Sequence, residues 1–161
     1  MWWSRVLLLL LVSLLAGCGF QARGAAQFPS ALAAVYVDGV NRYSPFYQEL
    51  TTAIRASGNP LAANANVADT VIRVTRDETG QRVLSVSPRN VPREYEIFYL
   101  VNYEVFSGGE RVLEPQALTR TRNYTYDETQ VLGKESEEDM LRRALARDLV
   151  SSVIRRISIL N

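Results

Sequence analysis

The chain has 161 residues, 47% of them hydrophobic and 22% charged, a composition that predicts one ordinary globular domain. Its 18 basic and 17 acidic side chains nearly balance, so no strong positive field is present to recruit nucleic acid. The sequence has no histidine, and Cys18 is its one cysteine. These facts exclude internal disulfides, Cys/His zinc clusters and histidine-based catalytic triads, and they argue against an enzyme.

Residues 1–17 have the layout of a secretory signal peptide. Arg5 precedes an apolar run over residues 6–15, and the small residues Ala16 and Gly17 follow. The run is only roughly ten residues long, whereas a membrane-spanning helix needs about 20. We therefore expect residues 1–17 to be removed, which leaves 17 basic and 17 acidic side chains in the mature chain.

The four residues from Leu15 to Cys18 form a lipobox, in which small residues before the cysteine let a dedicated peptidase create a new N-terminal cysteine. A cysteine that merely ends a signal sequence or lies in a core is the alternative, but the position directly after the apolar run favours lipidation of Cys18. Two or more acyl chains anchor a protein stably. Gly19 stands where aspartate typically retains bacterial lipoproteins in the inner membrane, so we expect an outer-membrane lipoprotein anchored on the periplasmic side.

The folded part begins after a short tether. Residues 21–29 show no clear period, and we interpret residues 18–32 as the lipidated N-terminus and a tether to a single α+β domain over residues 33–161. β-branched and aromatic residues predict a first strand over residues 34–40. After Ser44 and Pro45, apolar side chains recur at helical spacing, and a glycine and a proline then end the pattern. This predicts a helix of about three turns.

Three further strands are expected. Residues 68–87 hold two apolar clusters around a charged, glycine-containing stretch, which predicts either one long strand with a bulge or two short strands. Alternate positions over residues 95–105 are apolar or aromatic, the period of a strand, whereas the opposite face is mixed. Gly108 and Gly109 favour a two-residue hairpin turn. An antiparallel strand over residues 118–126 should follow, its earlier part broken by Pro115.

The C-terminal stretch predicts a long amphipathic helix. Ser136 stands three residues before Asp139, the spacing of an N-terminal capping box, and neighbouring glutamates suit the positive end of the helix dipole. The apolar residues that follow the helical period are Met140, Leu141, Ala144, Leu145, Leu149, Val153, Ile154 and Ile157. The element order is therefore βαβββα. The expected fold class is α+β, a four-stranded mixed β-sheet packed against two α-helices.

Several pieces together resemble the LptE family of lipopolysaccharide-assembly lipoproteins. The lipobox is shared by all bacterial lipoproteins, but a tyrosine-aspartate strand end followed by a lysine and an acidic helix is more selective. These pieces are the lipobox with Gly19-Phe20, Arg23-Gly24, Glu94-Tyr95, the run from Asn123 to Asp127, and Lys134 before Glu137-Glu138-Asp139-Met140. The resemblance runs over nearly the whole chain and includes the element order.

The resemblance implies a plug inside the LptD β-barrel that assists assembly of the barrel and contacts lipopolysaccharide. It implies no reaction and no cofactor. Two basic positions of the family are linked to lipopolysaccharide contact. Lys134 matches one of them through its spacing to the acidic run, and the other lies in the loop before Glu94, where Arg89 is offset by about one residue and Arg93 is also basic. Such side chains can bind lipid A phosphates through charge-assisted hydrogen bonds.

Plainer interpretations stay open. Lys134 can be a solvated loop lysine, Arg89 and Arg93 can be surface arginines, and the tyrosines can be ordinary sheet residues. Strand order predicts that both basic loops lie at the same end of the sheet. A generic periplasm-facing adaptor, such as a pilotin or a cell-wall-binding module, is the alternative function. A lipid-modified hydrolase lacks both a nucleophile-elbow glycine pattern and a histidine base.

Overall fold

The computed structural model describes residue 3 and residues 34–39, 41–125 and 131–160, with only the main chain of residues 131–134. The expected signal peptide, tether and lipidation site at Cys18 lie outside these residues, residue 3 apart. Among the helices of the described ranges, none is both long and apolar enough to cross a membrane.

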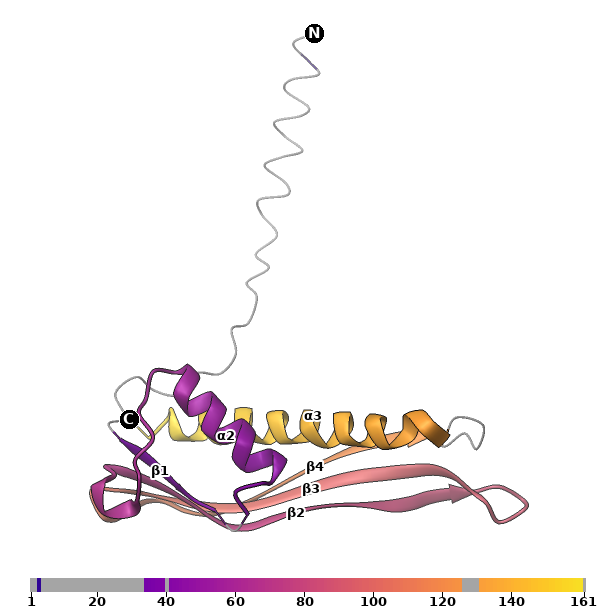
Figure 1. Ribbon diagram of the computed structural model, residues 1–161, viewed down its shortest axis with the longest axis horizontal. Coiled ribbons are helices and arrows are strands. Elements are labelled where there is room, and N and C mark those ends of the chain that lie inside the picture. The colour runs from indigo at the N-terminus through magenta and orange to yellow at the C-terminus, as the bar shows by residue number, and fades with distance from the viewer. Residues whose placement is uncertain (1–2, 4–33, 40, 126–130, 161) are drawn as a thin grey trace.

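The described residues form one sheet with helices on one face (Figure 1). The elements in chain order are β1 (Val35–Asp38), α2 (Pro45–Ala56), the short 3-10 helix η1 (Ala65–Val67), β2 (Thr70–Val86), β3 (Pro92–Ser107), β4 (Glu110–Thr125) and α3 (Val131–Ile157). The strands lie side by side in sequence order. β1 pairs parallel with β2, and the other two pairs are antiparallel. The predicted four-stranded mixed sheet with two helices, an α+β fold, is confirmed.

β2 is one long strand with a bulge, which decides between the two possibilities left open by the sequence. Its pairing with β3 shifts between Val74 and Arg76, so Thr75 is the extra residue. β3 has the predicted alternation. Tyr99, Val101 and Tyr103 are buried on the face toward the helices, whereas most of the opposite face is only half-buried.

Two tight turns connect the antiparallel strands. Gly108 and Gly109 both have positive φ, 57° and 86°, and they join the paired residues Ser107 and Glu110 as predicted. The other turn lies between β2 and β3, where the amide of Asn90 donates to the carbonyl of Ser87 at 2.9 Å. Asn90 takes φ 60°, a left-handed conformation that asparagine tolerates better than most residues.

β4 begins eight residues before the predicted start, at Glu110, and ends at Thr125. The expectation that Pro115 breaks this strand is wrong. β4 is an edge strand, and its register with β3 shifts around Pro115, so the missing N–H of proline falls where the ladder is already irregular.

The start of α2 is fixed by hydrogen bonds to the sheet. The Ser44 hydroxyl accepts from the amide of Tyr47 at 3.1 Å and donates to Asp77 of β2. The Tyr99 hydroxyl donates to the other Asp77 oxygen at 2.8 Å and accepts from the amide of Phe46 at 3.1 Å. These bonds satisfy two amides at the helix N-terminus. Burial raises the pKa of Tyr99 above its ordinary value.

α3 begins at Val131, so the prediction that Ser136 caps its start is wrong. Ser136 lies inside the helix and is exposed. Residues 131–135 contain no proline, and most are adequate helix formers, so nothing local stops the helix at Ser136. Met140, expected on the apolar stripe, is 65% exposed, but the rest of the stripe is buried or half-buried as predicted.

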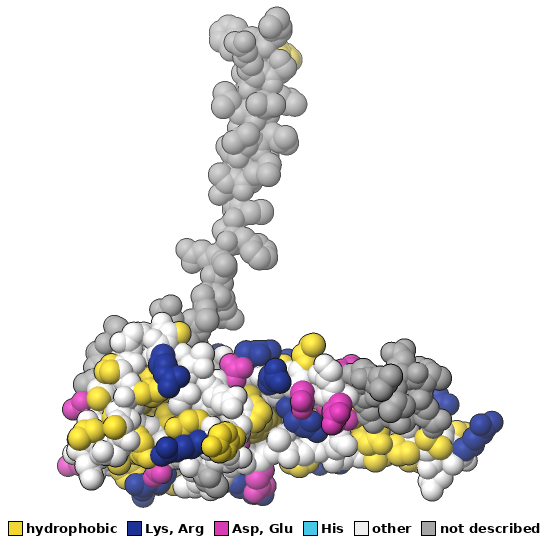
Figure 2. Space-filling model, in the orientation of Figure 1, with side chains coloured by type: hydrophobic (Ala, Val, Ile, Leu, Met, Phe, Trp, Pro, Cys, Tyr) yellow, Lys and Arg dark blue, Asp and Glu magenta, His cyan; other side chains and the backbone are white. Residues whose placement is uncertain are grey.

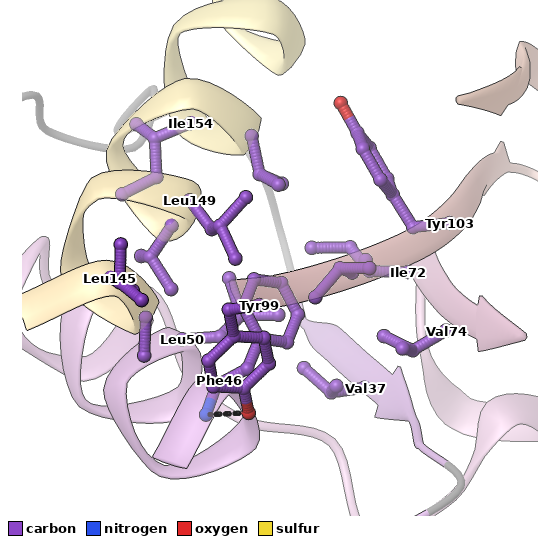
Figure 3. Packing of buried hydrophobic residues seen from close by; sticks show 14 of the residues in the cluster. Val37, Phe46, Leu50, Ile72, Val74, Tyr99, Tyr103, Leu145, Leu149 and Ile154 are labelled. Carbon is purple, nitrogen blue, oxygen red and sulfur yellow. Dashed lines mark hydrogen bonds between the residues drawn. The ribbon is translucent and has the colours of Figure 1, made fainter. Parts of the chain in front are cut away.

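The core lies between the helices and the near face of the sheet (Figure 3). Leu145, Leu149 and Ile154 of α3 pack in one cluster with Leu50 of α2 and Tyr99 of β3. α3 runs along the sheet over β3 and β4, and α2 packs against α3 and β1 (Figure 1). Neither helix therefore packs mainly on β2, whose last residues lead into the β2–β3 turn.

Candidate functional site

Arg89 occupies the tight turn between β2 and β3. The turn is closed from both sides, since the amide of Ser87 donates to the carbonyl of Val91 at 2.7 Å and the amide of Val91 donates to the Ser87 hydroxyl at 3.2 Å. Arg89 is exposed on this turn. Its main chain is therefore held in place while its guanidinium projects into solvent.

Arg93 lies in β3, as its second residue, rather than in the loop where the sequence interpretation placed it. The loop is shorter than expected because β3 begins at Pro92, where it pairs with Val86. The neighbouring pair is Ser85 with Glu94, so Arg93 has no partner residue in the ladder and forms a bulge. Among the described residues, the side chains of Arg89 and Arg93 have no hydrogen bond or ion pair, and both are exposed.

Lys134 lies in the first turn of α3, not in a loop before a capped helix. Its side chain lies outside the described part. Glu138, four residues later, accepts a hydrogen bond from the Tyr124 hydroxyl at 2.6 Å, near the end of β4. Because Thr125 pairs with Glu94, the end of β4 lies beside the start of β3. The turn with Arg89, the bulge at Arg93 and the first turn of α3 therefore lie at the same end of the sheet (Figure 1).

A polar cluster that the sequence interpretation missed holds the first part of α3 to the sheet. Besides Tyr124, Arg142 donates to Glu138 at 3.0 Å, and the two side chains are largely covered. The Gln81 amide, with its nitrogen toward the carboxylate, donates to Glu138 at 3.1 Å and to the Tyr124 hydroxyl at 3.2 Å. Burial and the bond to Glu138 raise the pKa of Tyr124 above its ordinary value.

The sequence interpretation assigned Glu138 to the helix dipole and to the acidic run that resembles the family, not to a contact with the sheet. The i,i+4 spacing of Glu138 and Arg142 is the one local signal that could have revealed the cluster. Its other members come from β2 and β4, 43 positions apart in the case of Gln81 and Tyr124. Tyr124 also stacks on Tyr95 of β3, with ring centroids 5.5 Å apart. The cluster fixes where α3 begins relative to the arginines.

The arginines of β4 have a structural role. Arg120 donates to the Ser152 hydroxyl at 3.0 Å and Arg122 donates to Asp148 at 3.1 Å, both on α3. Two basic side chains on the inner face of this edge strand are therefore directed at the helix. In the described residues, no group of histidine, cysteine or acidic side chains is placed to hold a metal ion.

A family model, described as LptE: Lipopolysaccharide-assembly, matches residues 32–157, most of the chain. The chain belongs to the LptE family. It is 24% identical to the LPS-assembly lipoprotein LptE of Pectobacterium atrosepticum over 153 residues, which is 94% of this chain and 83% of that protein. It is also 24% identical to the protein of the same name from Yersinia enterocolitica over 161 residues, 98% of this chain and 77% of the relative.

Solved structures show the same fold. A solution structure of lipoprotein B from Nitrosomonas europaea matches with a TM-score of 0.70 and 24% identity, over 87% of this chain and 90% of that one. The crystal structure of the rare lipoprotein B from Shewanella oneidensis matches with a TM-score of 0.65 and 21% identity, over 78% and 93%. Membership of LptE makes this chain a lipopolysaccharide-assembly lipoprotein, and the family is one of assembly factors rather than enzymes.

Proposed function

We propose that the protein is anchored through lipidated Cys18 on the periplasmic side of the outer membrane, and that it fills and helps to assemble an LptD-type β-barrel. In this role it contacts lipopolysaccharide on its way to the outer leaflet. Family membership and the relatives named LPS-assembly lipoprotein support this proposal. The lipobox supports the anchor.

The observation that supports the proposed contact with lipopolysaccharide is the pair of exposed arginines at one end of the sheet. Arg89 and Arg93 have no acidic partner among the described residues, so they are available to an anionic ligand. The first turn of α3 brings Lys134 to the same end. Guanidinium groups match phosphate oxygens in a fork geometry, and lipid A presents phosphates.

A charge-reversal experiment tests this contact. The double variant Arg89→Glu with Lys134→Glu should bind purified lipopolysaccharide roughly tenfold more weakly at low salt, since each exposed ion pair contributes up to about 1 kcal/mol. The residual binding should be less sensitive to salt than that of the parent. Arg55→Glu is the matched control, because Arg55 is an exposed arginine in the last turn of α2. Unchanged affinity of the double variant at low and moderate salt would remove these residues from the site.

Co-purification tests the barrel partner. The full lipoprotein, extracted from outer membranes, should bring down a β-barrel protein in about equal amount. The generic adaptor function would instead yield a soluble or peptidoglycan-associated partner. An extract with no barrel at all would contradict the proposed role as a plug and leave the lipopolysaccharide experiment as an independent test.

A further inference from the structure

The end of β2 carries three exposed aliphatic side chains, which we call the hairpin strip: Val83, Leu84 and Val86. They are 47%, 45% and 53% exposed. A strand with one buried face normally alternates apolar and polar residues, and isolated exposed aliphatic residues need no explanation. Three of them within four positions concentrate exposed apolar side chains at the end of one hairpin.

The fold leaves the hairpin strip uncovered for a reason. β1 pairs only with residues up to Arg73, so beyond that point β2 is an edge strand among the described residues. α3 packs mainly on β3 and β4, and α2 packs on α3 and β1. The β2–β3 hairpin also projects past the first turn of α3 (Figure 1). Neither helix therefore reaches the strip to bury it.

The strip continues an apolar row that starts under α3. Val83 pairs with Tyr95, and Tyr95 pairs with Tyr124, so the three side chains lie in register across β2, β3 and β4. Tyr124 is buried and stacks on half-buried Tyr95. Cross-strand neighbours on one face contact each other. The row of apolar side chains thus extends from the polar cluster around Glu138 to the open edge of the sheet.

Positive charge borders the strip. Arg89 lies three residues beyond Val86 in the turn, and Arg93 is the bulge residue between the pairs Val86 with Pro92 and Ser85 with Glu94. Glu94 accepts from the Ser85 hydroxyl at 2.8 Å. The other nearby charges, on Arg82 and Glu96, neutralise each other in an ion pair. Figure 2 shows hydrophobic side chains along this part of the molecule, with basic side chains at its tip.

We propose that the hairpin strip binds an acyl chain of the lipopolysaccharide molecule whose phosphates meet Arg89 and Arg93. This inference rests on the proposed function. It assigns an acyl chain of the ligand to the hairpin strip and the phosphates to the two arginines. An anionic amphiphile uses both the aliphatic side chains and the cations beside them. An extended polypeptide that paired with the open edge of β2 would use main-chain groups and would leave the two arginines without a role.

Site-specific photocrosslinking tests the inference in the full lipoprotein within its own cells. The photoreactive residue p-benzoylphenylalanine replaces Val86, or Pro88 beside Arg89, or the control Val112. Val112 is 44% exposed on β4, at the opposite end of the sheet. After irradiation, mild alkali hydrolyses the ester bonds that join acyl chains to the sugar of lipopolysaccharide, so an ester-linked chain crosslinked to the protein stays on the peptide without the sugar. The Val86 peptide should then retain a fatty acyl mass, and the Val112 peptide should carry no lipopolysaccharide.

A second measurement uses shape-conserving substitutions. The double variant Val83→Thr with Val86→Thr should lower the lipopolysaccharide adduct formed at Pro88 by about tenfold, since each hydroxyl buried under an acyl chain opposes binding. Val112→Thr should leave the adduct unchanged. Threonine keeps the branched shape and the strand propensity of valine, so the fold should persist.

The outcomes separate this inference from the function on which it rests. A Val86 adduct made of barrel polypeptide, with lipopolysaccharide still captured at Pro88, would overturn the acyl-chain assignment and leave the proposed function standing. Lipopolysaccharide absent from both positions would overturn the acyl-chain assignment and the lipopolysaccharide contact at this end of the sheet. A Val86 adduct whose crosslink, located by fragmentation, lies on the sugar rather than on an acyl chain would also contradict an acyl-chain contact.

Discussion

Replacement of Leu145 by alanine tests whether α3 is the main support of the sheet. Leu145 is 1% exposed, in the same cluster as Leu50 of α2 and Tyr99 of β3. Loss of its buried carbons removes about 2 kcal/mol of transfer free energy, and the cavity left behind adds about 1 to 2 kcal/mol. The free energy of unfolding should therefore fall by about 3 to 4 kcal/mol, a large part of the total of a domain this size.

Urea denaturation of the purified protein measures this loss as a lower transition midpoint at unchanged slope. Met140→Ala is the matched control on the same helix, because Met140 is 65% exposed, and its effect should stay within about 0.5 kcal/mol. Leu145→Asp should cost more than Leu145→Ala, since it buries an unpaired carboxylate. Equal midpoints for Leu145→Ala and Met140→Ala would refute the packing argument.

Three other perturbations follow from the sequence and the fold. Cys18→Ser should prevent lipidation, so the protein should be lost from the outer-membrane fraction. Mass spectrometry of the parent should show an acylated N-terminal cysteine rather than an unmodified N-terminus. Burial raises the pKa of Tyr99 in the folded state, so its contribution to stability is present below about pH 10 and is lost as the pH rises further. Tyr99→Phe should reduce this loss of stability at alkaline pH, measured by urea titration. An identical pH profile for variant and parent would contradict this prediction. Gly109 has φ 86° in the β3–β4 turn, so Gly109→Ala should lower the free energy of unfolding by about 1 kcal/mol, measured by thermal unfolding, and no loss would mean that the turn relaxes.

The secondary structure was largely predictable because its signals are local. The alternation along β3 and the apolar stripe of α3 are set by residues within a few positions of each other. The glycines at 108 and 109 specified their turn through backbone sterics alone. The errors fell where local signals compete. Ser136 is typical of a helix cap, but it lies inside α3. Pro115 is typical of a strand break, but it lies inside the edge strand β4.

The candidate site was predictable only in outline. Strand order sufficed to bring the turn with Arg89 and the start of α3 to one end of the sheet, since antiparallel neighbours exchange ends. The positions of Arg93 in β3 and of Lys134 in α3 depended on where each element begins. Element boundaries are set by pairing and capping contacts that the sequence does not display, so loops were expected where the chain is regular.

The sequence by itself determined the lipobox, the element order and the resemblance to the LptE family, because each depends on residue types at short, fixed spacing. Only the tertiary structure showed the polar cluster around Glu138, because its members are brought together from β2, β4 and α3. The exposure of the hairpin strip also depends on long-range packing. Val83 and Val86 have the same character as the buried Val74 of β2, and they stay exposed because β1 is short and α3 lies over the other strands.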